Sequence, residues 1–508
     1  MMKQGNNKTL VLVGLLLGLV FSELDQTVVS TAMPTIIRDL HGLSLYGWVM
    51  GVYLLSITIF MPIIGKLADL YGRRPIYLGC MALFMAGSIV SGLADSMTML
   101  LVGRGIQGIG AGGLMPLALI IIGDTYPLEQ RAKIQSVIGP MMILPQLLGP
   151  TVGGYLVDHM TWHWIFLINI PIGLVAAGLV AFGIRESVAK EKRSIDWAGA
   201  TTFALSMLSL LLAPVLIDVS GYSWSSPTII GLLALSFALI ALFIWIESKA
   251  KEPIIPLHLF KNRTIVVMSA LVFVIMLGVM GGTAAFPFFA QNVMGLTPTA
   301  SGYMLLSFMA GGVPASIVNG ILITKVAYRN LFIFSFVFPI IGFILLSQIN
   351  IDTSVMYVIV CCFLLGLGLG ALFGGDNLIV QESVEKEHSG VALSTVQLFQ
   401  SLGMTLGFSI FGSLLAKQIR TGVTGFADQF PPGAVDNIET GGIPKGLAPD
   451  LMVNVKTVFA ESFQNIFTIA IGFAIVAFII CWFMKKEVLS ENKETSSVAS
   501  GTALDLSK

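Results

Sequence analysis

The stretch Gly65–Pro75 reads GKLADLYGRRP, and it joins two apolar runs of the chain, residues 46–64 and 76–94. Each run is long enough to cross the hydrocarbon core of a bilayer, about 30 Å thick, as a helix. The glycines of the stretch permit a tight connection between two helices, and its basic residues favour the cytoplasmic side of a membrane. The stretch therefore indicates a helical hairpin in a membrane, with its turn in the cytoplasm.

The composition extends this prediction to the whole chain. Of its 508 residues, 55% are hydrophobic and 11% are charged, and the mean hydropathy is +0.88. A soluble domain carries about 25% charged residues, so this chain lacks the polar surface that contact with water requires. We therefore predict an all-α integral membrane protein with fourteen transmembrane helices. The expected spans are residues 9–33, 46–64, 76–94, 97–121, 136–157, 163–184, 197–217, 227–247, 264–290, 299–323, 331–348, 354–377, 389–415 and 462–484.

The distribution of Lys and Arg sets the expected topology. With the N-terminus inside, most of these residues fall in cytoplasmic segments, which supports cytoplasmic N- and C-termini. The long outer loop, residues 416–461, is rich in Gly and Pro and is expected to be partly irregular, with a short surface helix at 447–461. The first apolar run is longer than a signal-peptide core and is interpreted as a retained span. We expect a multi-pass protein of the cell membrane.

Several classes of function lack their sequence signatures. The formal net charge is zero, with 28 basic and 28 acidic residues, and no basic stripe indicates nucleic-acid binding. The four cysteines lie inside apolar runs, which indicates neither a disulfide framework nor a metal site. The sequence contains no P-loop, HExxH or GxSxG motif. We therefore expect no enzyme activity, no metal and no cofactor.

Two weak internal similarities indicate a repeat. Gly65 and Arg74 match Gly320 and Arg329 at an offset of 255 residues, and the glycines of 108–112 return at an offset of 258. Repeats of this kind predict two six-helix halves of the same orientation, with substrate bound at the midplane between them. The expected domains are an N-terminal six-helix bundle at 1–190, two extra central helices at 191–258, a C-terminal six-helix bundle at 259–486 and a polar cytoplasmic tail at 487–508.

Five segments carry a resemblance to a known transporter family. Gly65–Pro75 resembles the loop signature of the major facilitator superfamily between its second and third spans. Leu24–Val29 resembles the first-span signature of the fourteen-span drug:proton antiporters in that superfamily. Leu101–Gly110 is similar to their fourth-span motif, Gly149–Gly154 to their fifth-span antiporter motif, and Trp162–Pro171 to the entry of their sixth span. The resemblance covers nearly the whole chain, although its specific motifs lie in the first half.

The resemblance implies roles for two of these segments. The loop signature is implied to act as a conformational latch that helps to set the outward-facing state, and the fifth-span motif is implied to hinder leak through the closed end of an exporter. A topology anchor and ordinary packing of small residues are the simpler interpretations of the two segments. The latch residues would be Gly65, Asp69, Gly72, Arg73 and Arg74, and the antiporter-motif residues Gly149, Pro150, Gly153 and Gly154.

Three ionisable residues fall deep within expected spans, where a charge is costly and therefore points to function. Asp25 and Arg104 lie at similar depth below the outer surface, at about 1.5 Å per residue, so they could pair across a helix contact. Glu23 is two residues from Asp25, about 200° around the helix, so one acid could pair with Arg104 while the other faces a central cavity. Burial favours a protonated carboxyl and a nearby arginine favours the ionised form. All three are candidates for proton coupling, and a static ion pair is the alternative.

Further polar and aromatic residues are candidates for the lining of a substrate cavity. The alternatives are hydrogen bonds between helices for the amides and core or lipid contact for the aromatic residue. Asp376, near the cytoplasmic end of its span, is expected to be solvated or to cap its helix. The cavity candidates are Gln107, Gln146, Gln397, Gln400 and Phe286.

The leading functional hypothesis is proton-driven export of small amphipathic compounds by alternating access. The expected partners are the lipid bilayer, protons and lipophilic substrates, cationic ones if Glu23 or Asp25 faces the cavity. The proton gradient would be the energy source, and the resemblance implies a monomer. The alternatives are export of a lipid or an endogenous metabolite, or a non-transporting receptor on the same fold.

Overall fold

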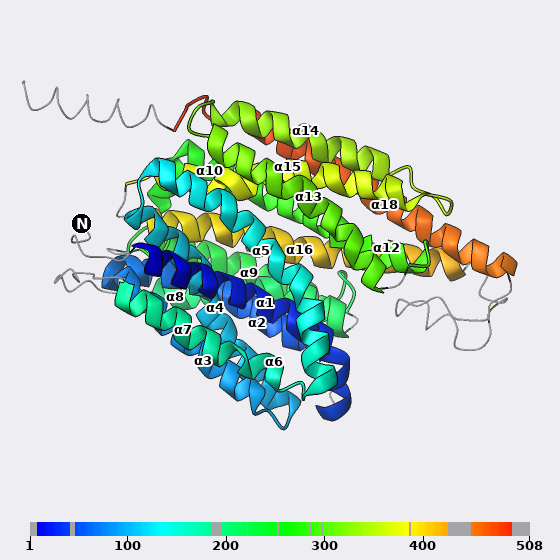
Figure 1. Ribbon diagram of the computed structural model, residues 1–508, viewed down its shortest axis with the longest axis horizontal. Coiled ribbons are helices and arrows are strands. Elements are labelled where there is room, and N and C mark those ends of the chain that lie inside the picture. Colours follow the sequence, from blue (N-terminus) through cyan, green and yellow to red (C-terminus); the bar gives the residue numbers. More distant parts are fainter. Residues whose placement is uncertain are drawn as a thin grey trace, which may run out of the picture. The chain divides into compact units, whose positions relative to one another are not determined.

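A computed structural model shows the chain as a set of helices (Figure 1). It describes residues 8–40, 46–183, 196–220, 222–250, 253–284, 286–296, 298–385, 388–424, 430 and 449–489, and some side chains within these ranges are also left out. No strand occurs among these residues. The helices of the first part are α1 (Lys8–Leu40), α2 (Tyr46–Tyr71), α3 (Arg73–Gly92), α4 (Met97–Thr125), α5 (Leu128–His159), α6 (Trp164–Leu167), α7 (Asn169–Gly183), α8 (Trp197–Ser220) and α9 (Pro227–Glu247).

The later helices include one broken span. Predicted span 264–290 consists of α10 (Arg263–Ile275), the π-helical turn η3 (Met276–Met280), α11 (Gly281–Ala284) and α12 (Phe286–Asn292). Such a π-turn interrupts the regular hydrogen-bond ladder of a helix. A 3₁₀ turn, η2 (Leu257–Lys261), precedes this span. The remaining helices are α13 (Pro298–Leu322), α14 (Tyr328–Leu346), α15 (Val355–Glu382), α16 (Ser389–Thr424) and α18 (Pro449–Trp482).

The described part of the chain contains eleven helices that are long and apolar enough to cross a membrane. Two shorter apolar helices, Trp197–Ala213 and Leu306–Leu322, coincide with two further predicted spans. The chain is therefore an all-α membrane protein with many spans. The number fourteen stays a prediction.

Segment 416–461, predicted as a long outer loop, differs in part from its prediction. Helix α16 continues to Thr424, and the helix predicted at 447–461 is present as the first part of α18, which begins at Pro449. Their apolar residues pack together: Val423 and Val455 are buried, and Gly422 lies against Val458. This contact stabilises the last turns of α16, which composition alone assigned to the irregular part of the loop. Residues 425–429 and 431–448 of the loop, and the predicted tail from 490 onward, lie outside the described residues.

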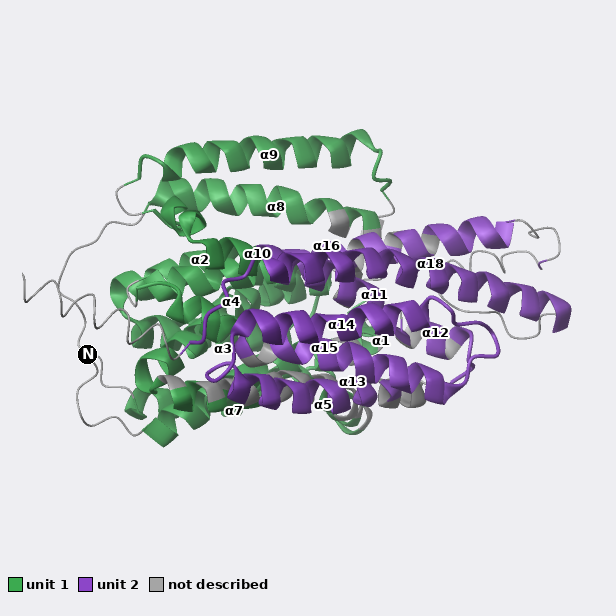
Figure 2. Cartoon of the chain, turned by 90° about the horizontal axis from the view of Figure 1, so that it is seen from above, with its two compact units in different colours: residues 1–269, 376–401 green, residues 270–375, 402–508 purple. Residues whose placement is uncertain are grey.

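The packing contacts group the chain into two compact units (Figure 2). Unit 1 contains residues 1–269 and 376–401, and unit 2 contains residues 270–375 and 402–508. These units follow packing and are not the same segments as the predicted repeats. Segment 376–401, which includes the turn between α15 and α16, counts with the helices of the first half.

Within unit 1, α3 and α4 cross at very close range. The crossing depends on Gly87, where an added Cβ would lie 2.7 Å from the carbonyl oxygen of Gly103. Small residues of this kind let two membrane helices bring their backbones together. The approach places Ser88 of α3 beside Gln107 of α4, where a polar site is built.

Candidate functional site

The candidate site of unit 1 is centred on a buried ion pair between α1 and α4. Arg104 donates through Nη1 to Oδ2 of Asp25, and neither side chain is exposed to solvent. Removing one partner of a buried pair leaves the other charge without compensation, which costs about 3–5 kcal/mol. The pair therefore fixes the contact between α1 and α4 as long as both groups are charged.

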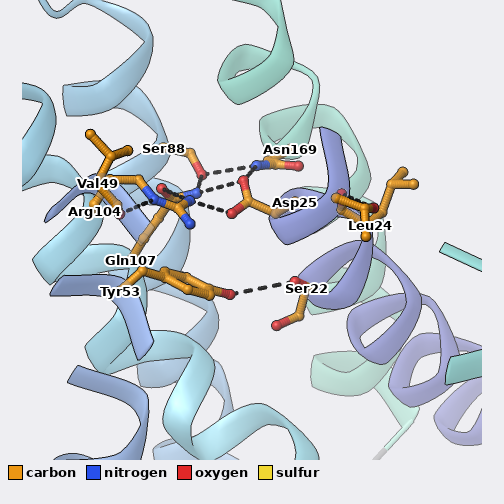
Figure 3. Close-up of polar contacts among 10 residues, drawn as sticks. Ser22, Leu24, Asp25, Val49, Tyr53, Ser88, Arg104, Gln107 and Asn169 are labelled. Carbon is orange, nitrogen blue, oxygen red and sulfur yellow. Dashed lines mark hydrogen bonds and ion pairs between the residues drawn. The ribbon is translucent and has the colours of Figure 1, made fainter. Parts of the chain in front are cut away.

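Two amides complete the surroundings of the Asp25 carboxylate (Figure 3). Its Oδ1 accepts hydrogen bonds from Gln107 Nε2 at 3.0 Å and from Asn169 Nδ2 at 2.8 Å. Both amides also donate to the hydroxyl oxygen of Ser88, at 2.8 Å and 3.3 Å. The Asp25 carboxyl group thus accepts hydrogen bonds from three donors, which come from α4 and α7.

Arg104 is held on its other sides by α2. Its guanidinium lies over the ring of Tyr53, with Cζ 3.9 Å from the ring centroid, which is cation–π geometry. Nη1 also donates to Gln107 Oε1 at 3.0 Å, and Nε makes a long contact of 3.5 Å with the Val49 carbonyl oxygen. The Tyr53 hydroxyl approaches the Ser22 carbonyl oxygen at 3.4 Å. Tyr53 therefore connects the ion pair with the part of α1 next to Glu23.

Asn169 enters the site from the start of α7. It is the first residue of that helix and is 3% exposed. The residues before it, Trp164–Leu167, form the single turn α6, and Trp162 is buried against Phe166 in an edge-on ring contact of 6.3 Å. This aromatic packing fixes the entry to α7, so the amide of Asn169 is positioned by the protein core.

Glu23 lies on the other side of α1 from Asp25. It is partly exposed and forms no hydrogen bond or ion pair with any residue that the structure describes. The residue before it in the chain, Ser22, is the one whose carbonyl oxygen the Tyr53 hydroxyl approaches. The two acids of α1 therefore have different surroundings: Asp25 accepts three hydrogen bonds, and Glu23 accepts none from the described residues.

The predicted latch residues lie at the end of α2 and the start of α3, next to the first turns of α16. Asp69 accepts the backbone N–H of Val391 at 3.2 Å, in the first turn of α16. A helix N-terminus stabilises an anion placed there. Arg73 pairs with Asp124 at 2.9 Å and lies 3.5 Å from Asp69. Gly72 has φ 98° between α2 and α3, a conformation that favours glycine.

Two other latch residues make contacts of their own. Arg74 Nη2 donates to the Ala181 carbonyl oxygen at 2.7 Å and so ties α3 to α7. Gly65 lies directly against the Ser394 hydroxyl of α16. Together with the Asp69 contact, this places the loop signature against segment 376–401.

The fifth-span motif contacts α1. An added Cβ at Gly149 would overlap the Thr27 hydroxyl, and Thr27 Oγ1 donates to the Pro145 carbonyl oxygen at 2.9 Å. Gly153 is buried. The surroundings of Pro150 and Gly154, and those of the cavity candidate Gln146, lie outside what the structure describes. The motif thus places α5 against the turn of α1 that follows Asp25.

The remaining cavity candidates are distributed over several environments. Gln107 is part of the ion-pair network, and Gln397 is buried with Nε2 3.5 Å from Asn377 Oδ1. Gln400 is partly exposed. Phe286 is 3% exposed and packs on Phe467, with ring centroids 5.5 Å apart.

Asp376 corrects a sequence expectation. The expected position was solvated or helix-capping, but Asp376 lies within α15, is 5% exposed and accepts the backbone N–H of Asn377 at 2.7 Å. The estimate of depth placed it near the cytoplasmic end of a span, but it could not reveal the neighbouring helices that cover that end.

Sequence reasoning missed three members of the site: Tyr53, Ser88 and Asn169. Asn169 left the clearest signal, since it is an amide inside the apolar segment Leu167–Pro171. Serines and tyrosines occur in many apolar runs, so Ser88 and Tyr53 carried no comparable signal.

The sequence of this chain is similar to those of known proteins over most of its length. The profile of the Major Facilitator Superfamily matches residues 15–408. The chain is 35% identical to the multidrug transporter protein MdtP of Bacillus subtilis, with 97% of this chain and 96% of the relative covered. It is 34% identical to multidrug resistance protein 3 of the same organism, with 98% and 99% covered.

Two solved structures share the fold. The human organic anion transporter MFSD10 aligns with a TM-score of 0.60 at 14% identity, covering 92% of this chain and 100% of that chain. The proton:xylose symporter XylE aligns with a TM-score of 0.61 at 13% identity, covering 96% and 98%. At these identities the similarity establishes the fold alone.

Proposed function

The chain belongs to the major facilitator superfamily, and from that premise we propose that it is a proton-coupled antiporter that exports small lipophilic compounds. Its multidrug-transporter relatives support drug efflux as the activity. The family consists of membrane transporters and not of enzymes. We further propose that it acts as a monomer in the cell membrane with both termini in the cytoplasm, as the Lys and Arg distribution predicts.

The observation that carries the proposal is the buried Asp25–Arg104 pair with its amide donors. A carboxylate in this position changes its proton occupancy when the helices around it move, because its three hydrogen-bond donors come from two other helices, α4 and α7. If α4 or α7 shifts, Asp25 loses hydrogen-bond donors, and its protonated form becomes more populated. A conformational cycle that loosens and restores these bonds would therefore load and release a proton.

Glu23 supplies the second part of the proposal. It has no cationic partner among the described residues and lies near Tyr53. A carboxylate that is partly withdrawn from water favours a lipophilic cation, which neutralises it without a large hydration penalty. We assign to Glu23 the preference for cationic substrates and to Asp25 the coupling to protons.

Proton movement in inverted membrane vesicles tests the function. A pH gradient is imposed and followed with a pH-sensitive dye, and ethidium, a neutral antibiotic and a lipophilic acid are added in turn. A compound that discharges the gradient in vesicles containing the unmodified protein, and does not in vesicles containing Asp25→Asn, supports proton antiport. Transport that follows a sodium gradient, or that needs no gradient, would show that the proton-coupled assignment is wrong.

A further inference from the structure

Positive charge gathers in unit 2 where the turn between α13 and α14 meets the end of α18. Residues 322–330 and 482–489 contain four cations and one acid, Glu487, which pairs with Lys485 at 3.9 Å. The cluster therefore keeps an excess of positive charge, at an end of the helices that the Lys and Arg distribution predicts to be cytoplasmic. Its cations are Lys325, Arg329, Lys485 and Lys486.

The segment that follows α18 is fixed against the start of α14. The backbone N–H of Tyr328 donates to the Glu487 carbonyl oxygen at 3.2 Å, and Leu489 is buried. Figure 1 draws this last described segment in red beside the start of α14. The two exposed lysines that precede Glu487 are therefore held in the same part of the structure as Arg329, the neighbour of Tyr328 in the chain.

Arg329 has hydrogen-bond donors without acceptors. Its guanidinium lies over the ring of Trp482, with Cζ 5.3 Å from the ring centroid. It forms no hydrogen bond or ion pair with any residue that the structure describes, and its Nε is buried without an acceptor. A buried donor of this kind is unfavourable, so Arg329 favours an acceptor from outside the chain.

The internal repeat supplies a comparison for this arginine. At the offset of 255 residues, Arg329 corresponds to Arg74. Arg74 Nη2 donates to the Ala181 carbonyl oxygen at 2.7 Å, in α7, which is the last helix of the predicted N-terminal bundle. The last helix of the second half, α18, presents the ring of Trp482 to Arg329 and no carbonyl oxygen. The second copy has therefore kept the arginine without its acceptor in the protein.

The side chains next to the cluster suit contact with a membrane. Trp482 and Phe483 are both more than half exposed, and aromatic residues of this kind are typical of the boundary between hydrocarbon and headgroups. Ile475 and Ile479 precede Trp482 at helical spacing and are also exposed. One face of α18 is thus apolar as far as the tryptophan, and the cations follow it, which is the order of acyl chain and phosphate in a phospholipid.

We propose that Arg329, Lys485 and Lys486 bind the phosphate of an anionic phospholipid, whose acyl chains lie along the exposed face of α18. Basic pockets between transmembrane helices bind such headgroups, and the planar guanidinium of an arginine matches a phosphate in bidentate geometry. A lipid with a net negative charge is favoured over a zwitterionic one, because four cations and one acid leave three positive charges in the cluster. This binding site goes beyond the proposed transport activity and does not depend on it.

Fluorescence quenching by brominated lipids measures this preference at Trp482 itself. The full chain is reconstituted into vesicles of phosphatidylglycerol and phosphatidylcholine, with bromine on the acyl chains of either lipid at equal mole fraction. The same chain carrying Trp482→Phe is measured in parallel, so that the difference isolates Trp482 from the other tryptophans. The ratio of the quenching by the two brominated lipids gives the preference of the site for the anionic lipid.

The variants are Arg329→Gln, Arg329→Lys and the double variant Lys485→Gln with Lys486→Gln, each with and without Trp482→Phe. The matched control is Lys249→Gln, because Lys249 also lies over a tryptophan, with Nζ 4.0 Å from the ring centroid of Trp245. It removes the same charge from a different place on the protein. Size-exclusion profiles before reconstitution separate a loss of lipid binding from misfolding.

We expect brominated phosphatidylglycerol to quench Trp482 more strongly than brominated phosphatidylcholine, and Arg329→Gln to lower this preference about fivefold. The double lysine variant should also lower it, Arg329→Lys should retain part of it, and Lys249→Gln should leave it unchanged. Equal quenching by the two lipids in the unmodified protein, or equal losses in Lys249→Gln and Arg329→Gln, would overturn the proposal. Displacement of the lipid by inorganic phosphate at constant ionic strength would overturn it too, by showing a site for free phosphate.

Discussion

Asp25 and Glu23 lie two residues apart on α1, and Asp25 is enclosed by three hydrogen-bond donors, while Glu23 has no such partner among the described residues. The helical period explains the difference, since a step of two residues turns a side chain by about 200°. One side of α1 packs on α4 and α7, and the other side carries Glu23. A single turn of helix thus holds two carboxylates with different chemistry, and each can be tested separately.

Replacing Asp25 by Asn should abolish discharge of the pH gradient by ethidium. The amide cannot carry the proton, and it leaves Arg104 as a buried cation without its anion, which costs about 3–5 kcal/mol. Vesicle assays measure the first effect, and thermal unfolding in detergent measures the second. Asp95→Asn, at an exposed acid between α3 and α4, should behave as the unmodified protein. Gradient discharge by Asp25→Asn at the normal rate would remove Asp25 from the coupling step.

Replacing Glu23 by Gln should selectively weaken transport of cations. Loss of a charge interaction worth about 1.4 kcal/mol corresponds to a tenfold rise in the apparent KM for ethidium. A neutral antibiotic should be transported with unchanged KM, because it makes no use of the carboxylate. Glu23→Asp retains the charge on a shorter side chain and should give a smaller effect. An equal loss for the cation and the neutral compound would contradict a role in charge selection.

The ion pair could be predicted from sequence because ionisable residues are rare in apolar runs. Asp25 and Arg104 were placed at similar depth by counting residues along two spans, and the structure brings them into contact. The donors around them could not be predicted in the same way. Ser88 and Gln107 meet only because α3 and α4 cross closely at Gly87, which depends on how the helices pack.

In the fold, too, the features that depend on a local stretch of sequence were predicted, and those that depend on a packing partner were not. Apolar runs predicted most of the helices because the bilayer requires each run to satisfy its own backbone hydrogen bonds. The extension of α16 beyond its predicted end was missed, since its last turn is stabilised by packing of Val423 and Gly422 against the facing helix. A helix at 447–461 was predicted, but it is continuous with the following span in α18. Composition in a short window contains no information about that partner.

Replacing Asn169 by Ala should reduce proton coupling while leaving the ion pair in place. The change removes a 2.8 Å hydrogen bond to the Asp25 carboxylate, and bonds to a charged group contribute about 1.5–3 kcal/mol. Asn169→Asp should be more harmful, because it places a second acid beside the first. The initial rate of gradient discharge measures both effects. Asn319→Ala is the control, since that amide bonds to Ala315 in its own helix. Equal activity of Asn169→Ala and Asn319→Ala would show that the donor is dispensable.

Replacing Gly149 by Ala should impair folding or transport because α5 contacts α1 at this position. The new Cβ would overlap the hydroxyl and the Cβ of Thr27, so one of the two helices must shift. Overpacking of this kind costs about 1–3 kcal/mol. The shift would occur one half-turn from Asp25 and would disturb its donors.

The matched control is Gly178→Ala on α7, where an added Cβ meets no atom within 4 Å. It should leave both stability and transport unchanged. Thermal unfolding and the rate of ethidium-driven gradient discharge are measured for both variants. Thr27→Gly combined with Gly149→Ala removes the overlapping atoms and should recover part of the lost activity. If Gly149→Ala unfolds and transports as Gly178→Ala does, the close contact between α1 and α5 has no part in the transport cycle.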